Sequence, residues 1–105
     1  YAKKILKTEG QINWSDNALT TIGKINGLFP SPGAFFNFNG ERYKILKAQI
    51  GNRKGKVGEV LTDKLEIACG GNQSIEIIEI QRQGKRPQKI DNFLIGSKIK
   101  KGLVL

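Results

Sequence analysis

Lysine and arginine side chains offer the clearest chemistry in this sequence, because they occur in clusters with few acids between them. There are 18 Lys and Arg against 9 Asp and Glu, a net charge of +9. Such an excess favours a polyanionic partner, either a nucleic acid or an acidic membrane surface. The clusters lie in segments 3–7, 42–56 and 82–89. The candidate phosphate-binding residues are Lys3, Lys4, Lys7, Arg42, Lys44, Lys47, Arg53, Lys54, Lys56, Arg82, Lys85, Arg86 and Lys89.

The basic residues could form a binding surface or simply an ordinary solvated surface. The positions of the acidic residues help to decide between these two interpretations. Segments 42–56 and 82–89 contain no acid, whereas five acids fall between residues 59 and 79. We therefore expect one side of the molecule to be mixed in charge and the other nearly all basic. Phosphate contacts position a ligand without reading its bases. Engagement of ~6 phosphates would weaken binding about a thousandfold between 50 and 200 mM salt.

Catalytic and metal-binding motifs are missing from the sequence. There is no histidine, and therefore no Ser-His or Cys-His pair, and no phosphate-binding glycine loop or dinucleotide motif. Glu76 and Glu79 are interpreted as solvent-facing strand carboxylates. Cys69, the only cysteine, lies in an alternating segment and is expected to be a buried thiol. The chain alone is expected to catalyse nothing and to hold no metal or cofactor.

The length of 105 residues predicts one domain. Residues 1–10 show no apolar period and are expected to form a linker or arm, and residues 11–105 the domain. The absence of a starting Met is consistent with a fragment of a longer protein. The longest uncharged stretch, 25–39, is broken by glycines and prolines, and no apolar region follows the first residues, so a cytoplasmic location is expected.

One amphipathic helix is predicted after Ser15, which is a candidate N-cap, with Trp14 and Leu19 placed to pack as a hydrophobic staple. Gly23 and Gly27 each weaken such a helix by roughly 1 kcal/mol relative to Ala. Pro30 to Gly33 would end it. The apolar stripe that should face the core consists of Ala18, Ile22, Ile25 and Phe29, flanked by Leu19 and Leu28.

Short strands are predicted for the rest of the chain, which makes the fold mainly β, an antiparallel meander or small barrel. Asn39-Gly40 signals a hairpin. Alternation slips once at Ile45-Leu46 and once at Ile77-Ile78, which predicts β-bulges and favours a barrel. At least two of the rings of Phe35, Phe36 and Phe38 are expected in the core. The expected strands lie in 34–38, 43–50, 57–61, 65–69, 75–80 and 99–105, with a short helix over 90–95 ended by Gly96.

These segments together resemble the C-terminal domain of methionyl-tRNA formyltransferases from end to end. Residues 12–15 resemble the "IDWS" that starts that domain's helix, 29–35 resemble its "NPWPGA(Y/F)" turn, and 40–48 resemble its strand "GxRLKIWKA". The tail, 75–81, 84–86, 91–96 and 101–105, resembles "LRLLELQ…GKK…DFLRG…PGxxL". Two positions depart from the pattern: Ser31 replaces a tryptophan, and Lys89 stands where a helix-capping serine is common.

The resemblance implies an OB-like barrel that helps hold the acceptor arm of initiator methionyl-tRNA. A separate N-terminal domain, with the family's catalytic Asn, His and Asp, would transfer the formyl group from 10-formyltetrahydrofolate. The implied partners are initiator tRNA and that catalytic domain, in a monomeric protein. Lys3, Lys4 and Lys7 would border the tRNA path. Six cations fall on segments that form a basic channel in the family: Arg42, Lys44, Lys47, Arg82, Lys85 and Arg86.

Two other functions remain open at this point. The chain could be the equivalent domain of a UDP-sugar or other folate-dependent formyltransferase, acting as a structural cover without RNA. It could also be a stand-alone binder of single-stranded RNA, in which case Phe36 or Tyr43 should stack on bases.

Overall fold

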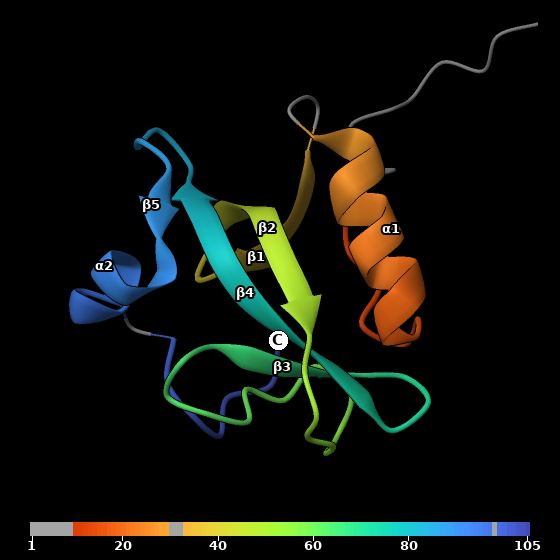
Figure 1. Cartoon of the computed structure of the whole chain (residues 1–105). Helices are drawn as coiled ribbons and strands as arrows, with labels where there is room; N and C mark the ends of the chain where they lie inside the picture. The colour runs from red at the N-terminus through yellow and green to blue at the C-terminus, as the bar shows by residue number, and fades with distance from the viewer. Residues whose placement is uncertain (1–9, 30–32, 98) are drawn as a thin grey trace, which may run out of the picture.

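The computed structural model describes residues 10–29, 33–97 and 99–105, so Lys3, Lys4, Lys7 and most of the turn predicted at 30–33 lie outside the described residues. The chain is mostly β, as predicted. Its elements are α1 (Ala18–Leu28), β1 (Ala34–Phe38), β2 (Glu41–Ile50), β3 (Glu66–Cys69), β4 (Gln73–Arg82), β5 (Gln88–Lys89) and α2 (Ile90–Ile95). The antiparallel sheet has the order β1-β2-β4-β3, with β5 also on β4. It curls into a half-barrel with the two helices at opposite ends (Figure 1).

The β1–β2 hairpin forms where the sequence predicts it. Asn39 and Gly40 have φ of 52° and 77°, and Phe38 faces Glu41 across the turn. Two positive φ values in a two-residue loop match the right-handed twist of the strands, which is why Asn-Gly is favoured there. The turn fixes the register of the whole β1–β2 pair.

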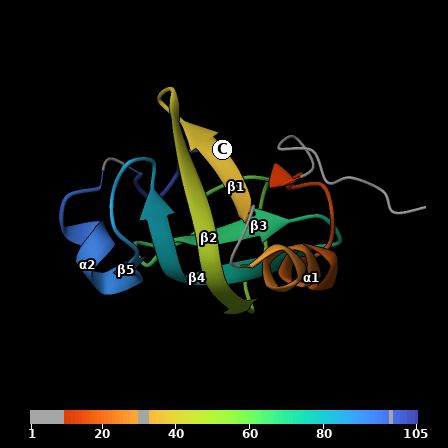
Figure 2. The same cartoon turned by 90° about the horizontal axis from the view of Figure 1, so that it is seen from above.

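The two predicted bulges are confirmed in the β2–β4 pair. Ile45 faces Ile80 but Lys47 faces Glu79, so Leu46 is the extra residue on β2. The next residue of β2, Ala48, faces Ile77 and not Ile78, so Ile78 is the extra residue on β4. Bulges bend a strand and increase its local twist. The resulting curvature, by which β2 crosses over β3, is clear from above (Figure 2).

The core lies inside the curl of the sheet and under α1. A chain of aromatic rings runs through it: Phe36 stacks on Tyr43 with centroids 5.4 Å apart, and Tyr43 meets the edge of Phe93 at 5.8 Å. Phe35 and Phe36 are both buried, as expected. Cys69 is buried too, and burial raises the pKa of its thiol, which confirms the expected core cysteine.

The predicted start of α1 is wrong by two residues. Asn17, not Ser15, is the N-cap, and its Oδ1 accepts a hydrogen bond from the Thr20 amide at 2.8 Å. The preceding segment is held against the sheet because the Gly70 amide donates to the carbonyls of Trp14 and Asp16 at 2.9 and 3.0 Å. The helix therefore cannot begin earlier. Leu19 is 67% exposed, so it forms no staple with the buried Trp14.

Only part of the predicted apolar stripe of α1 enters the core. Ala18 and Ile25 are fully buried, whereas Phe29 is exposed at the helix C-cap. Thr21 takes one of the buried positions, and its hydroxyl donates to the Asn17 carbonyl at 3.0 Å. Neither described helix is long and apolar enough to cross a membrane.

Segments 57–61 and 99–105 do not form the two regular strands that the sequence predicts. They contribute isolated bridges, Glu59 with Val104 and Val60 with Ile67. The left-handed φ of 84° at Gly58 interrupts the extended backbone, and the amide of Val60 donates to Leu103 rather than to a sheet neighbour. The short helix α2 is confirmed, with Phe93 buried and Gly96 as its C-cap.

Candidate nucleic-acid interface

The ten described candidate cations occupy four places on the sheet and its connections. Arg42 and Lys44 lie on β2, while Arg82, Lys85 and Arg86 end β4 and enter the next turn. Arg53, Lys54 and Lys56 form the basic loop, residues 53–56, and Lys47 and Lys89 flank β4. The strand register brings Arg42, Lys44 and Arg82 to one end of the β2–β4 pair. The basic loop follows the other end of β2 (Figure 1).

Tyr43 and Ile45 of β2 are buried in the core. Because successive side chains of a strand point to opposite faces, Arg42 and Lys44 project from the other face of β2. The Arg42 guanidinium carbon lies 4.0 Å from the centroid of the Phe35 ring, a cation–π contact. Lys44 lies over Gly33, where a Cβ would come 3.1 Å from Lys44 Cδ. The stems of both cations are thus packed, and the two charges line a 220 Å³ hollow with Gln81 and Gln83.

Arg82 is held by an ion pair with Glu41. Its Nε and Nη2 donate to the two carboxylate oxygens of Glu41, the Nη2 bond being 2.7 Å, and the Tyr43 hydroxyl donates to the same carboxylate at 3.3 Å. The hydrogen bonds from Arg82 lower the pKa of the Glu41 carboxyl. Glu41 thus occupies one edge of the Arg82 guanidinium and competes with a phosphate for that edge.

Lys85 and Arg86 lie in the turn between β4 and β5, and this turn is fixed by two hydrogen bonds. The Lys85 amide donates to the Arg82 carbonyl at 2.9 Å, and Gln81 Nε2 donates to the Lys85 carbonyl at 3.0 Å. Both side chains are exposed and line a hollow of about 540 Å³ between the β1–β2 turn, the β4–β5 turn and α2. We call this cavity the α2 hollow.

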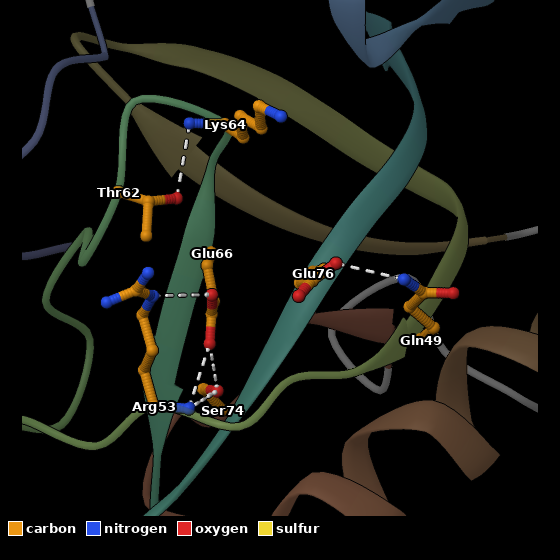
Figure 3. Close-up of polar contacts among 7 residues, drawn as sticks. All are labelled: Gln49, Arg53, Thr62, Lys64, Glu66, Ser74 and Glu76. Carbon is orange, nitrogen blue, oxygen red and sulfur yellow. Dashed lines mark hydrogen bonds and ion pairs between the residues drawn. The ribbon is translucent and has the colours of Figure 1, made fainter.

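The basic loop is anchored at its start by a buried carboxylate (Figure 3). Glu66 of β3 is 3% exposed, and its Oε2 accepts hydrogen bonds from Ser74 Oγ at 2.5 Å and from the Arg53 amide at 3.1 Å. Arg53 Nε lies 3.5 Å from Glu66 Oε1, although the Arg53 side chain is 62% exposed. A Cβ at Gly51 would come 2.5 Å from Ser74 Oγ, so only glycine fits where the chain leaves β2.

The other end of the basic loop is anchored by Glu59. Its Oε1 accepts a hydrogen bond from the Lys56 amide at 3.1 Å, and its own amide donates to the Lys56 carbonyl at 2.8 Å. Gly55 packs so closely that a Cβ would lie 2.6 Å from Leu61 Cδ2. The loop thus holds its three exposed cations on a backbone fixed at both ends.

Lys47 and Lys89 lie on either side of Glu79. The register pairs Lys47 with Glu79 and Glu79 with Lys89 across three strands. Side chains directly opposite each other in adjacent strands are about 5 Å apart at Cβ. The acid offsets part of the positive charge in this row, which leaves two cations and one acid there.

Sequence reasoning missed the residues that support these cations. The sequence places Glu66 among the acids of a mixed surface, but it is buried and bonded to Ser74, while Glu59 and Glu41 hold other cationic segments. No local signal marks Glu66, because its contacts join segments that only the fold brings together. Within the described ranges, no three acidic or cysteine side chains gather as a metal site would require. The arrangement is suited to binding anions.

Comparison with known proteins agrees with this architecture. The family model "Formyl transferase, C-terminal domain" matches residues 4–98. A methionyl-tRNA formyltransferase of Pelagibacter ubique is 65% identical over 97% of this chain, and one of Rickettsia canadensis is 40% identical over all of it. The chain spans about a third of the length of these relatives, 33% and 35%.

Among solved structures, HypX from Aquifex aeolicus in complex with tetrahydrofolic acid matches with a TM-score of 0.70 at 20% identity, over 87% of this chain and 17% of that one. This likeness concerns the fold. The family match covers nearly the whole described chain, and the resemblance drawn from the sequence motifs points the same way. The chain is therefore a member of the formyl transferase C-terminal domain family.

Proposed function

We propose that this chain is the tRNA-docking domain of a methionyl-tRNA formyltransferase. The observation that carries the proposal is the 65% identity, over 97% of the chain, to a protein of that name. The parent enzyme would transfer a formyl group from 10-formyltetrahydrofolate to the amino group of initiator methionyl-tRNA. This domain would hold the acceptor arm while an N-terminal domain performs the chemistry, in a monomeric cytoplasmic protein.

The proposed docking surface consists of the anchored cations. Lys85 and Arg86 at one end of the sheet and the basic loop at the other are exposed on fixed backbone, so binding must order their side chains but not the segments that carry them. Arg42 and Lys44 add a third contact region, and Lys3, Lys4 and Lys7 would extend the path. The full proposed set also includes Lys47, Arg82 and Lys89.

The chemical step belongs elsewhere in this proposal. By the resemblance, the family's catalytic Asn, His and Asp lie in the N-terminal domain, and the sequence of this chain contains no histidine. The contribution of this domain to the reaction is then positional. Holding the tRNA in place converts part of the binding energy into orientation of the reacting amino group.

Titration of the chain with initiator tRNA, followed by fluorescence anisotropy from 50 to 200 mM salt, tests the proposal. Contact with ~6 phosphates predicts about a thousandfold loss of affinity over this range. The double variant Lys85→Glu, Arg86→Glu should weaken binding and flatten the salt dependence. Its matched control is Lys64→Glu, Lys100→Glu, which changes the net charge equally at exposed positions outside the four places.

Absence of salt-dependent tRNA binding would overturn the proposal and favour the structural cover of a sugar formyltransferase. The third function, binding of single-stranded RNA by Phe36 or Tyr43, is not favoured. These rings are 3% and 7% exposed and stack on each other, so neither face is available to a base.

A further inference from the structure

The geometry points to a binding site for one unstacked RNA nucleotide in the α2 hollow, an inference that rests on the proposed function. Residues from the end of β1, the start of β2, the end of β4 and α2 line the hollow. In the cartoon, α2 lies beside β5 at this side of the sheet (Figure 1). Its volume, about 540 Å³, falls in the ~300–1,000 Å³ range of small-molecule sites. Three kinds of side chain line it: cations, one accessible aromatic ring and carboxamides.

The cations supply a phosphate site. Lys85 and Arg86 both line the hollow, and neither forms an ion pair within the described part of the chain. Arg82 lines it too, but Glu41 holds it. That pair is nearly neutral, so the carboxylate of Glu41 opposes an incoming phosphate less than a free acid would. The net positive charge of the hollow therefore resides on Lys85 and Arg86.

Phe38 supplies the stacking surface. It is the last residue of β1 and only partly buried, and its ring centroid lies 6.5 Å from that of Tyr43 at an interplanar angle of 59°. Tyr43 and Phe93, which also line the hollow, are both buried and form its floor. Phe38 is the ring that a base could approach. Stacking on such a ring is worth ~1–3 kcal/mol per base and tolerates any sequence.

The carboxamides supply hydrogen bonds to a base edge. Asn39 and Asn92 are both exposed and line the hollow from the β1–β2 turn and from α2. A carboxamide both donates and accepts, so it can pair with the edge of any base. Proteins read RNA mainly at unstacked bases held between such groups and aromatic rings. The α2 hollow combines all three requirements of a nucleotide site, whereas the basic loop offers charge alone.

Phe38→Leu is the primary test, with the exposed Phe29→Leu on α1 as its matched control. Phe38→Leu should weaken binding of initiator tRNA and of a short single-stranded RNA by up to about 5- to 160-fold, since one stacked base is lost. The slope of log affinity against log salt should stay unchanged, because stacking releases no counterions. Phe29→Leu should change neither quantity.

Asn92→Ala covers the case in which Phe38→Leu disturbs the fold, because Asn92 is exposed on α2. It should weaken binding about 3- to 10-fold, the loss of one hydrogen bond, and Asn26→Ala on α1 is its control. Titration with nucleoside 5′-monophosphates should shift the NMR signals of Phe38, Asn92 and Lys85. The inference fails, while the proposed function stands, if tRNA binding responds to Lys85→Glu, Arg86→Glu but not to Phe38→Leu or Asn92→Ala.

Discussion

Ser74 Oγ donates a hydrogen bond of 2.5 Å to Glu66 Oε2, and both residues are buried. The same carboxylate oxygen accepts from the Arg53 amide, so one acid joins β3, β4 and the start of the basic loop (Figure 3). A buried carboxylate is costly unless it is hydrogen-bonded. Here its partners are the Ser74 hydroxyl and the Arg53 amide, which also donates to Ser74 Oγ at 3.2 Å, so the three groups together fix where the loop begins.

Ser74→Ala should lower the free energy of unfolding by about 1.5–3 kcal/mol, because a buried charged acceptor loses its shortest hydrogen bond. Urea titration measures this. The control is Glu76→Gln, which alters a carboxylate on the same strand that bonds Gln49 at an exposed position and should change stability by less than about 0.5 kcal/mol. Equal stabilities for Ser74→Ala and the wild type would show that Glu66 does not depend on Ser74.

Gly51→Ala should displace the basic loop, since the new methyl group would collide with Glu66 and Ser74. We expect a loss of about 1–3 kcal/mol of stability, as for other overpacked sites, together with weaker tRNA binding. Gly96→Ala is the matched control for the loss of stability, because nothing lies within 4 Å of its Cβ position and its φ is −111°. If both variants unfold at the same urea concentration, the space around Gly51 can accept a methyl group and the prediction is wrong.

Gly23→Ala and Gly27→Ala should each stabilise the chain by about 0.5–1 kcal/mol. Both glycines lie in α1, are exposed, and have no atom within 4 Å of the position that a Cβ would occupy. Alanine there costs no contact and reduces the entropy of the unfolded chain. Thermal unfolding should show a raised Tm for each variant and an additive rise for the pair. A lowered Tm would mean that the face of α1 bearing these glycines packs against another part of the molecule.

Phe36→Ala should cost about 3–5 kcal/mol, the usual range for a buried ring, because Phe36 packs between Trp14 and Tyr43. Affinity for RNA, measured where the variant is still folded, should remain that of the wild type. This outcome separates the core ring from Phe38 at the α2 hollow. A specific loss of RNA affinity without loss of stability would instead restore Phe36 as a stacking residue.

Local sequence signals predicted the elements whose cause is local. Asn39-Gly40 forms its hairpin because both positive φ values come from these two residues, and the slips at Leu46 and Ile78 appear because each bulge leaves one residue out of the alternation. Ser15 failed as an N-cap for a non-local reason. The amide of Gly70, far along the chain, donates to the Asp16 carbonyl, which a helix capped by Ser15 would use for its own hydrogen bonds.

The same distinction applies to the candidate site. Clusters of lysine and arginine are visible in the sequence, but their division between the two ends of the sheet depends on the β2–β4 register. In the sequence, Glu66 looks like any acidic residue on the exposed face of a strand. Its burial becomes apparent only in the folded structure, where Gly51 and Ser74 pack against its carboxylate. Phe38 and Asn92 meet at one hollow although they lie far apart in the sequence.

Glu41→Gln should separate the structural role of the Glu41–Arg82 pair from its effect on RNA binding. The folded state lowers the pKa of Glu41 through its bonds with Arg82, so the ionised acid favours folding above its unfolded pKa of about 4.3. That stabilisation is lost as the pH falls through the lowered folded pKa. The stability difference between wild type and variant, measured by urea titration, should thus be largest near neutral pH and vanish in acid.

The same variant should bind tRNA more tightly, because Arg82 is released from its competitor and becomes available to a phosphate. One additional phosphate contact predicts a salt slope steeper by about 0.9 and a gain in affinity that is greatest at low salt. Asp63→Asn raises the net charge equally at an exposed turn remote from Arg82 and serves as the control. An equal gain for both variants would mean that net charge alone, and not the release of Arg82, controls the affinity.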